Sequence, residues 1–112
     1  MVDLSFLKDF TKGDTAKMQR YIDMYLRIAP TTFQQMQEAV NSQDWEQLRI
    51  GAHSLKPQAE YMGATELKVA LALIEENVES GRYKELPNAF QLASQLFLES
   101  EESLRKALLD LV

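Results

Sequence analysis

The only histidine of the chain, His53, is the residue best suited to carry out chemistry. A neutral imidazole is a nucleophile near pH 7, because the reference pKa of histidine is about 6.5. Arg49, four residues before His53, and Lys56, three residues after it, reach the same patch of a helix surface. Two flexible cations beside an imidazole suit an anion held on the ring, so we expect His53 to accept a phosphoryl group.

The residues that the chain lacks restrict this chemistry further. A self-sufficient phosphoryl-transfer enzyme needs a phosphate-binding glycine loop, a metal site and a positioned base. The 112 residues include no glycine-rich loop, no cysteine and one histidine. A di-metal site in a helical bundle would need Glu-x-x-His pairs. Several acidic residues suggest such a site, but no such pair occurs among them: Glu75, Glu76, Glu101 and Glu102. We therefore expect a phosphoryl carrier rather than an enzyme, without a metal or cofactor of its own.

Charge and hydropathy indicate the kind of partner. The formal net charge of −5 argues against non-specific nucleic-acid binding, which depends on a basic surface. The longest apolar run, residues 69–74, is far shorter than the roughly 20 residues that cross a bilayer. Residues 1–10 lack the basic and then apolar pattern of a signal peptide. We expect a cytoplasmic monomer that binds another protein and no membrane.

The spacing of apolar residues predicts helices along almost the whole chain, and no useful stretch alternates with the period of a strand. Because the residue before a proline disfavours the helical region, we expect a helix that starts after Asp14 to stop before Pro30. A separate helix should then run to about residue 41, and later helices should cover residues 65–80 and the chain after Pro87. Short connections favour antiparallel neighbours. The prediction is one all-α domain over residues 1–112, an up-and-down four-helix bundle with one or two additional N-terminal helices.

The helix that carries His53 should begin after a cap at Ser42 or Asp44 and end at Gly63. Its apolar residues recur at spacings of three and four, which is typical of a face packed in a bundle: Trp45, Leu48, Ala52, Leu55, Ala59 and Met62. At about 100° per residue, His53 lies roughly 130° from the centre of that face. The imidazole should therefore face solvent, together with Glu46, Arg49, Ile50, Lys56, Pro57 and Glu60.

The stretch Ala52-His53-Ser54-Leu55-Lys56, followed by Tyr-Met-Gly-Ala at residues 61–64, resembles the signature of histidine-containing phosphotransfer (HPt) domains. Residues 3–7, 13–14, 25–33 and 44–46 also resemble features of that family, so the similarity extends over nearly the whole chain. The resemblance implies that His53 is the phosphoacceptor through Nε2 and that Lys56 stabilises the phosphorylated ring. It also implies a partner, the receiver domain of a response regulator or hybrid histidine kinase, which would bind any Mg²⁺.

The chain departs from the family pattern directly after the lysine, where Pro57 replaces the usual glycine. Pro57 follows His53 by four residues, so it removes the helical hydrogen bond to the His53 carbonyl and pushes that carbonyl away. We predict a local kink there. The proline still adds little bulk and no competing polar group beside the histidine.

The other residues around His53 have two interpretations each. Arg49 either assists a bound phosphoryl group or simply pairs with Glu46 or Glu60 on the surface. A receiver could dock on Arg49, Ile50, Pro57 and Glu60, and on Phe33 or Gln34 if the preceding helix borders the site, although scattered exposed apolar residues are ordinary. Two functions therefore stay open. One is a phosphorelay intermediate, and the other is a phosphorylation-independent helical adaptor that binds and inhibits a kinase or response regulator.

Overall fold

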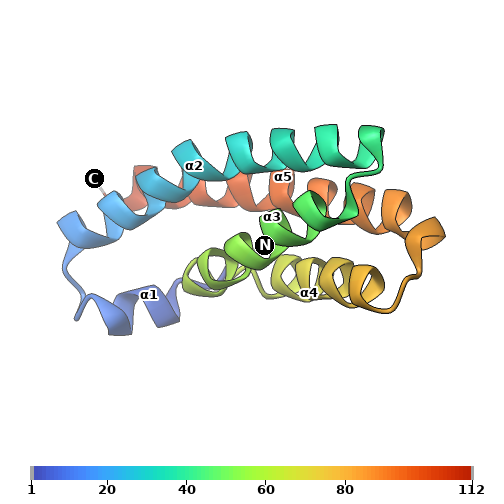
Figure 1. Ribbon diagram of the computed structural model, residues 1–112. Coiled ribbons are helices and arrows are strands. Elements are labelled where there is room, and N and C mark those ends of the chain that lie inside the picture. Colours follow the sequence, from blue (N-terminus) through green and yellow to red (C-terminus); the bar gives the residue numbers. More distant parts are fainter. Residues whose placement is uncertain (1, 112) are drawn as a thin grey trace.

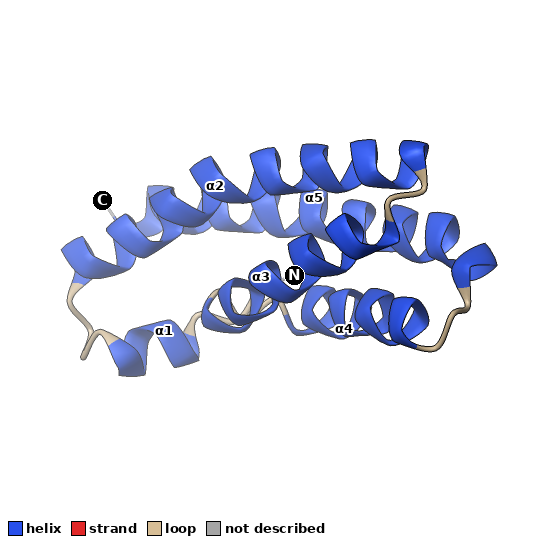
Figure 2. Cartoon of the chain, viewed as in Figure 1, coloured by secondary structure: helices blue, strands red, loops and turns tan. Residues whose placement is uncertain are grey.

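The computed structural model describes residues 2–111, and all regular structure in that range is helical (Figure 2). The helices are α1 (Ser5–Phe10), α2 (Thr15–Ser42), α3 (Trp45–Tyr61), α4 (Thr65–Glu79) and α5 (Leu86–Leu111), with a short 3₁₀ turn, η1 (Tyr83–Glu85), before α5. Figure 1 shows α2 to α5 as an antiparallel bundle with the short α1 at one end. The predicted fold class is therefore confirmed, with one additional N-terminal helix.

The four long helices pack in a ring. α3 packs against α2 and α4, and α5 closes the ring by packing against α4 and α2. The result is an elongated body of 43 × 20 × 18 Å. Its core is formed by the apolar faces that the spacing predicted, and its largest fully buried side chains include Leu7, Ile22, Met36, Leu48, Leu55, Leu71, Ile74, Leu86 and Leu104.

Aspartate side chains cap the N-termini of two of the long helices, α2 and α3. Asp14 Oδ1 accepts a hydrogen bond from the Lys17 backbone N–H at 3.1 Å, and Asp44 Oδ1 accepts one from the Gln47 N–H at 3.2 Å. Such caps contribute about 1 kcal/mol each. Of the two candidates for the cap of the histidine helix, Asp44 is the cap, because Ser42 is the last residue of α2.

The predicted break before Pro30 is wrong, since α2 runs without interruption from Thr15 to Ser42. A proline inside a helix costs roughly 3 kcal/mol through a lost hydrogen bond and a steric conflict with the preceding turn. The neighbours Ala29 and Phe33 are buried on either side of Pro30 along the helix. Burial of that apolar face against the bundle offsets the local cost, so that one 28-residue helix replaces the two that were expected.

α3 likewise continues through Pro57 and ends four residues later at Tyr61. Pro57 therefore does not terminate the histidine helix. Its ring is exposed on the same side as His53. The kink predicted at this point stays a prediction.

The turn after α3 holds the N-terminal segment in place. Gly63 has a φ of +67°, and its carbonyl accepts a hydrogen bond from the Asp3 backbone N–H at 3.1 Å. A side chain on Gly63 would overlap the Asp3 backbone. The close approach therefore requires glycine and sets the position from which α1 begins.

Candidate functional site

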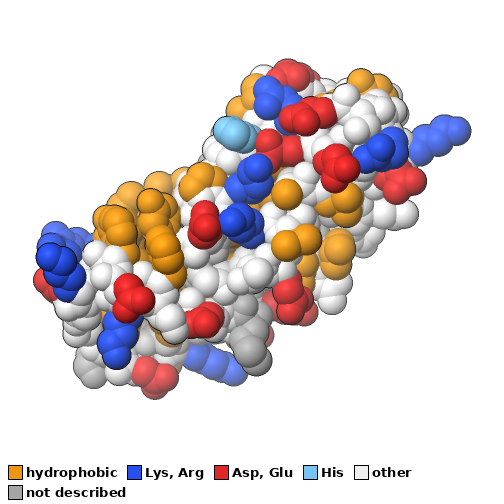
Figure 3. All heavy atoms as spheres, turned by 90° about the horizontal axis from the view of Figure 1, so that it is seen from below, with side chains coloured by type: hydrophobic (Ala, Val, Ile, Leu, Met, Phe, Trp, Pro, Cys, Tyr) orange, Lys and Arg blue, Asp and Glu red, His pale blue; other side chains and the backbone are white. Residues whose placement is uncertain are grey.

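His53 lies on the outward face of α3, with 67% of its side chain exposed. Figure 3 shows the imidazole at the surface, with acidic and basic side chains on one side of it and hydrophobic side chains on the other. The prediction that His53 faces solvent is confirmed. The buried face of α3 is formed by Leu48, Ala52, Leu55 and Ala59, as the spacing indicated.

A carboxylate from the neighbouring helix holds the imidazole. Glu75 of α4 is only 8% exposed, and its Oε2 lies 3.0 Å from His53 Nδ1. Its other oxygen, Oε1, lies 2.6 Å from the Nζ of Lys56. One carboxylate thus joins the histidine and the lysine that the sequence singled out. Because its contact with Glu75 occupies Nδ1, Nε2 is the ring nitrogen left for a reaction.

The charge state of Glu75 follows from two opposing effects. Burial raises the pKa of this carboxyl group, but the contacts with Lys56 and His53 lower it and outweigh the burial. The net pKa of Glu75 lies below its usual value, so the group is an anion at neutral pH. An ionised carboxylate only accepts hydrogen bonds, so His53 Nδ1 and Lys56 Nζ are both donors to it.

Arg49 and Glu60 are each paired with a surface residue of opposite charge. The Nε of Arg49 donates to Glu46 Oε1 at 2.9 Å, and this contact lowers the pKa of Glu46. Glu60 Oε1 lies 3.1 Å from the Nζ of Lys68. Exposed pairs of this kind contribute little to stability. Of the two surface pairings predicted for Arg49, the structure shows the one with Glu46, and its role as a phosphate helper stays a prediction.

Ile50 and Pro57 lie on the outward face of α3, as predicted. Ile50 is 45% exposed one turn before His53, and Pro57 is exposed one turn after it. Both therefore border the histidine on the outward face of α3.

Phe33 and Gln34, the two residues of α2 predicted to help dock a receiver, differ in exposure. Phe33 is 7% exposed and stacks on Phe97 of α5, with 4.5 Å between ring centroids, so it belongs to the core. Gln34 is exposed, but it shares a helix face with Gln37 and Asn41, which line a surface hollow next to α5. Phe33 is therefore not available for docking, whereas a docking role of Gln34 stays a prediction. The residues of the uninterrupted α2 that line a hollow beside α3 are Thr32, Gln35 and Met36.

The structure adds an apolar region that sequence reasoning missed. Phe6 and Phe10 of α1 are 47% and 50% exposed, and each ring centroid lies 5.4 Å from that of Tyr61 on α3. Tyr21 of α2 meets Phe10 edge to face at 5.6 Å. We call Phe6, Phe10, Tyr21 and Tyr61 the aromatic surface. The signal was the spacing of Phe6 and Phe10, which puts two large rings on one face of a very short helix.

The aromatic surface continues the outward ridge of α3. His53, Pro57 and Tyr61 follow one another at intervals of four residues, so they lie in a row along the helix. Figure 3 shows hydrophobic side chains gathered beside the histidine. The exposed imidazole therefore lies at the border of an apolar region that reaches to α1.

The described residues, 2–111, contain no group of three or more His, Asp or Glu side chains placed to hold a metal ion. No helix among them is long and apolar enough to span a membrane. The acidic residues Glu75 and Glu76, which suggested a di-metal site, have different contacts: Glu75 binds Lys56 and His53, and Glu76 lies 3.5 Å from Arg82.

Comparison with known proteins agrees with this geometry. The structure is similar to the crystal structure of histidine-containing phosphotransfer protein B (HptB) from Pseudomonas aeruginosa PAO1, with a TM-score of 0.89 over 97% of this chain and 95% of that chain. Their sequences are 18% identical, so the likeness concerns the fold. No curated protein matches the chain in sequence. The sequence model of the Hpt domain matches residues 20–111, which include His53 and most of the bundle. The chain therefore belongs to the Hpt domain family.

Proposed function

We propose that this protein relays phosphoryl groups between aspartates of receiver domains, with His53 Nε2 as the acceptor. The observation that carries the proposal is the exposed imidazole of His53, bound through Nδ1 to Glu75 in a chain of the Hpt family. A ring held at one nitrogen and open at the other suits a group that must be reached by a second protein.

The transfer is a simple displacement. The Nε2 lone pair attacks the phosphorus of an aspartyl phosphate, the N–P bond forms, and the P–O bond to the aspartate breaks as the carboxylate leaves. Lys56 offsets the charge of the phosphoryl group on the ring. The receiver domain supplies Mg²⁺ and the remaining catalytic groups, so the chain acts as a carrier and not as an enzyme.

We propose that the receiver docks on the outward face of α3. Interfaces are apolar and aromatic at their centre and charged at their rim. Ile50, Pro57 and the aromatic surface supply the apolar part, while Arg49 and Glu60 lie at the rim. The cognate receiver is selected by the contours and charges of this face.

The proposal is tested by incubating the protein with a ³²P-labelled phosphorylated receiver. We expect an acid-labile, base-stable label on the wild-type chain and none on His53→Gln. Because the chain has one histidine, the label reports on His53 alone. The Lys56→Ala variant should accept the label more slowly or lose it sooner, with unchanged helicity. Label that persists on His53→Gln, or that no cognate receiver transfers, would contradict the relay function.

A second function is supported by the aromatic surface, which could bind a partner without any chemistry at His53. In that case the chain is an adaptor that inhibits a kinase or response regulator by occupying it. Two results together would favour the adaptor: the His53→Gln variant fully inhibits the kinase or response regulator, and the wild-type chain takes up no label. The cytoplasmic location and the monomeric state stay predictions from the sequence.

A further inference from the structure

Two hollows open along the first half of α2 and meet at Tyr21 and Met24. The larger, of about 580 Å³, lies between α1 and α2 and is lined by Phe10, Thr11, Lys17, Arg20, Tyr21 and Met24. The smaller, of about 230 Å³, lies between α2 and α3 and is lined by Tyr21, Met24, Tyr25, Ile28, Gln58, Tyr61 and Met62. We call the two hollows together the α2 groove. Because Phe10, Tyr21 and Tyr61 also form the aromatic surface, the groove continues that surface onto α2.

We propose that the α2 groove binds an amphipathic helix of a partner protein, whose apolar side chains enter the groove and whose flank carries acidic residues. The inference goes beyond the proposed function, since this helix contacts the chain away from Nε2 of His53 and needs no phosphoryl group. Its binding can therefore be measured on the unphosphorylated protein.

The floor of the groove is an apolar face of α2 that the bundle leaves exposed. Met24 and Ile28 are both exposed, and the half-buried Tyr21 precedes them at helical spacing, so the three side chains lie in one row along α2. Contiguous apolar side chains on an exposed face mark a surface that binds another molecule. The flexible side chain of Met24 adapts to the shape of such a partner. The groove therefore favours an occupant with apolar side chains.

The backbone around the groove indicates that the occupant is itself helical. The groove lies between α1, α2 and α3, whose backbone N–H and C=O groups bond within their own helices. Such a groove offers side chains only, so an extended segment gains no hydrogen bonds for its backbone, whereas a helix satisfies its backbone internally. Residues 17–28 extend roughly 17 Å along α2. This length accommodates about three turns of a helix packed alongside.

The charges at the groove select an acidic helix. Lys17 and Arg20 line its α1 end, and none of the described residues that line the groove is acidic. The surrounding stretch is basic for this chain: residues 8–28 contain five Lys or Arg and three Asp or Glu, whereas residues 29–112 contain seven and thirteen. An acidic flank therefore complements the groove, and a basic flank is repelled.

Lys17 and Arg20 also differ from the other cations in their contacts. Six of the seven Lys and Arg residues after residue 28 pair with a glutamate of the chain: Arg49, Lys56, Lys68, Arg82, Arg105 and Lys106. Neither Lys17 nor Arg20 forms an ion pair with any described residue. Both are exposed at the edge of an apolar hollow, so they are available to the carboxylates of a bound helix.

The first test compares two synthetic helical peptides of about 18 residues. Both carry leucine at spacings of three and four on one face, and their flanks carry glutamate in one peptide and lysine in the other. Because the whole chain has a net charge of −5, a preference for the glutamate peptide reports the local cations.

In fluorescence anisotropy we expect wild type to bind the glutamate peptide at least about tenfold more tightly than the lysine peptide. The glutamate peptide should also shift the NMR signals of the Met24 methyl group and of the amides of residues 17–28. Equal affinities, no binding of the glutamate peptide, or shifts confined to other helices would overturn the proposal.

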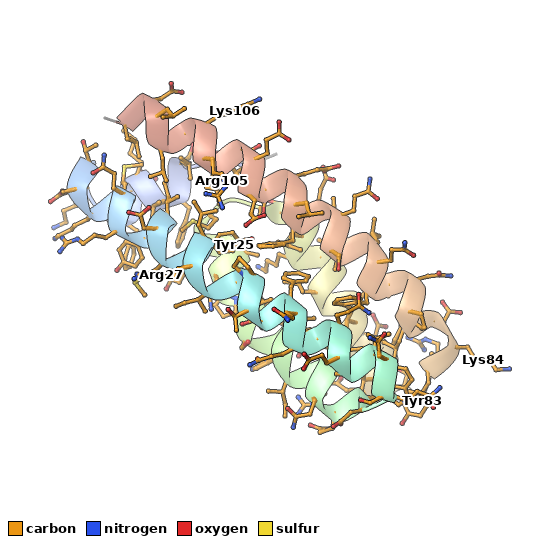
Figure 4. The ribbon with its side chains drawn as sticks, turned by 90° about the horizontal axis from the view of Figure 1, so that it is seen from above. Tyr25, Arg27, Tyr83, Lys84, Arg105 and Lys106 are labelled. Atoms are coloured by element: carbon orange, nitrogen blue, oxygen red, sulfur yellow. The ribbon has the colours of Figure 1, made fainter. Side chains whose placement is uncertain are left out.

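The second test reverses one charge of the groove at an exposed position. We expect Arg20→Glu to weaken binding of the glutamate peptide roughly fivefold and to strengthen binding of the lysine peptide, because repulsion replaces attraction. Lys84→Glu is the matched control, since Lys84 is exposed and Figure 4 shows it at the end of the bundle opposite α1. Both affinities of Lys84→Glu should stay within about twofold of wild type. Equal effects of the two variants would assign the preference to net charge and overturn the proposal.

A membrane is the other partner that exposed apolar side chains and cations attract. Binding of wild type to vesicles of phosphatidylcholine and phosphatidylserine, without a preference between the two peptides, would assign the groove to anionic lipids and overturn the proposal. The relay is tested separately by the ³²P label. Wild type that takes no label from any receiver contradicts the relay, whereas equal binding of the two peptides overturns the inference about the groove alone.

Discussion

Between α3 and α4 the contacts nearest the surface are made by charged side chains, whereas between α2 and α5 the contacts are made by aromatic rings and buried hydroxyl groups. Glu75 joins His53 and Lys56 across the first pair of helices. In the second pair, Phe33 stacks on Phe97, and Tyr25 Oη lies 3.0 Å from Ser100 Oγ. Figure 4 shows Tyr25 on α2 beside α5.

The two pairs of helices therefore have different roles. The contacts between α2 and α5 stabilise the fold, whereas the contacts between α3 and α4 orient the side chains around His53. Buried apolar contacts dominate the free energy of unfolding, and the α2–α5 pair contributes them on helices other than the one that carries His53. The contacts of Glu75 with His53 and Lys56 are opposed by the burial of its carboxylate, so these side chains serve the geometry and charge around the ring rather than stability. The protein can therefore change the residues around the imidazole without loss of the fold, and the predictions below test that separation.

The largest effect is expected for Phe33→Ala in the α2–α5 pair. Removal of a buried phenylalanine costs about 3–5 kcal/mol through lost burial and the cavity that remains. Urea denaturation should show this loss. Ile50→Ala, next to His53, is the control, and its free energy of unfolding should change by less than about 0.5 kcal/mol. Equal losses in the two variants would contradict the separation.

Gly63→Ala should have the next largest effect on stability. The new side chain requires a strained positive φ, which costs roughly 1–3 kcal/mol, and it displaces the Asp3 backbone. Gly81→Ala is the matched control, because Gly81 has a φ of +71° and no atom near the position of a Cβ. We expect the smaller loss for Gly81→Ala, and only Gly63→Ala should expose more of α1 to hydrogen exchange. Equal losses and equal exchange would show that the contact with Asp3 contributes nothing.

The caps and the faces of the helices were predictable because they depend on nearby residues. Asp14 and Asp44 cap their helices through backbone groups three residues away. The outward position of His53 followed from the spacing of the buried residues of α3. Periodicity within one helix is enough for both, because the helix geometry fixes which residues share a face.

The errors and omissions all depend on tertiary contacts. The break at Pro30 was expected from a local rule, which the burial of Ala29 and Phe33 overrides. The same continuity of α2 turned Phe33 into the core. The contact of Glu75 with His53 depends on how α3 and α4 are rotated and aligned against each other, and the spacing within either helix does not determine this.

Tyr25→Phe should have a moderate effect in the α2–α5 pair. The Ser100 hydroxyl donates to the Phe97 carbonyl at 2.6 Å, so it accepts from Tyr25 and keeps a partner in the variant. The loss should therefore be about 1 kcal/mol in urea denaturation at pH 7. Ser94→Ala, at a half-buried position of α5, is the control and should be nearly neutral.

The same tyrosine has a predicted pH dependence. Burial raises the pKa of Tyr25 to about 12, so the folded state holds the phenol proton more tightly than the unfolded state does. The stability contributed by the neutral phenol is present below pH 10 and falls as the pH rises from 10 toward 12. Wild type should therefore lose stability relative to Tyr25→Phe over that range. A constant difference between the two proteins would contradict the assignment.

The smallest effect on stability is expected for Glu75, because its burial opposes its two favourable contacts. The pKa of Glu75 in the folded protein lies below the ordinary value of 4.5, so the folded state favours the ionised form. Its contribution to stability is present above pH 4.5 and is lost as the pH falls through the folded pKa. Urea denaturation from pH 7 to pH 3 should therefore show that wild type loses stability relative to Glu75→Gln on acidification. The control is Glu79→Gln, at an exposed position one turn later on α4, which should follow wild type. If Glu75→Gln and wild type instead stay parallel, the pKa of Glu75 is the same in the folded and the unfolded protein, and its contacts with His53 and Lys56 do not favour the ionised carboxylate.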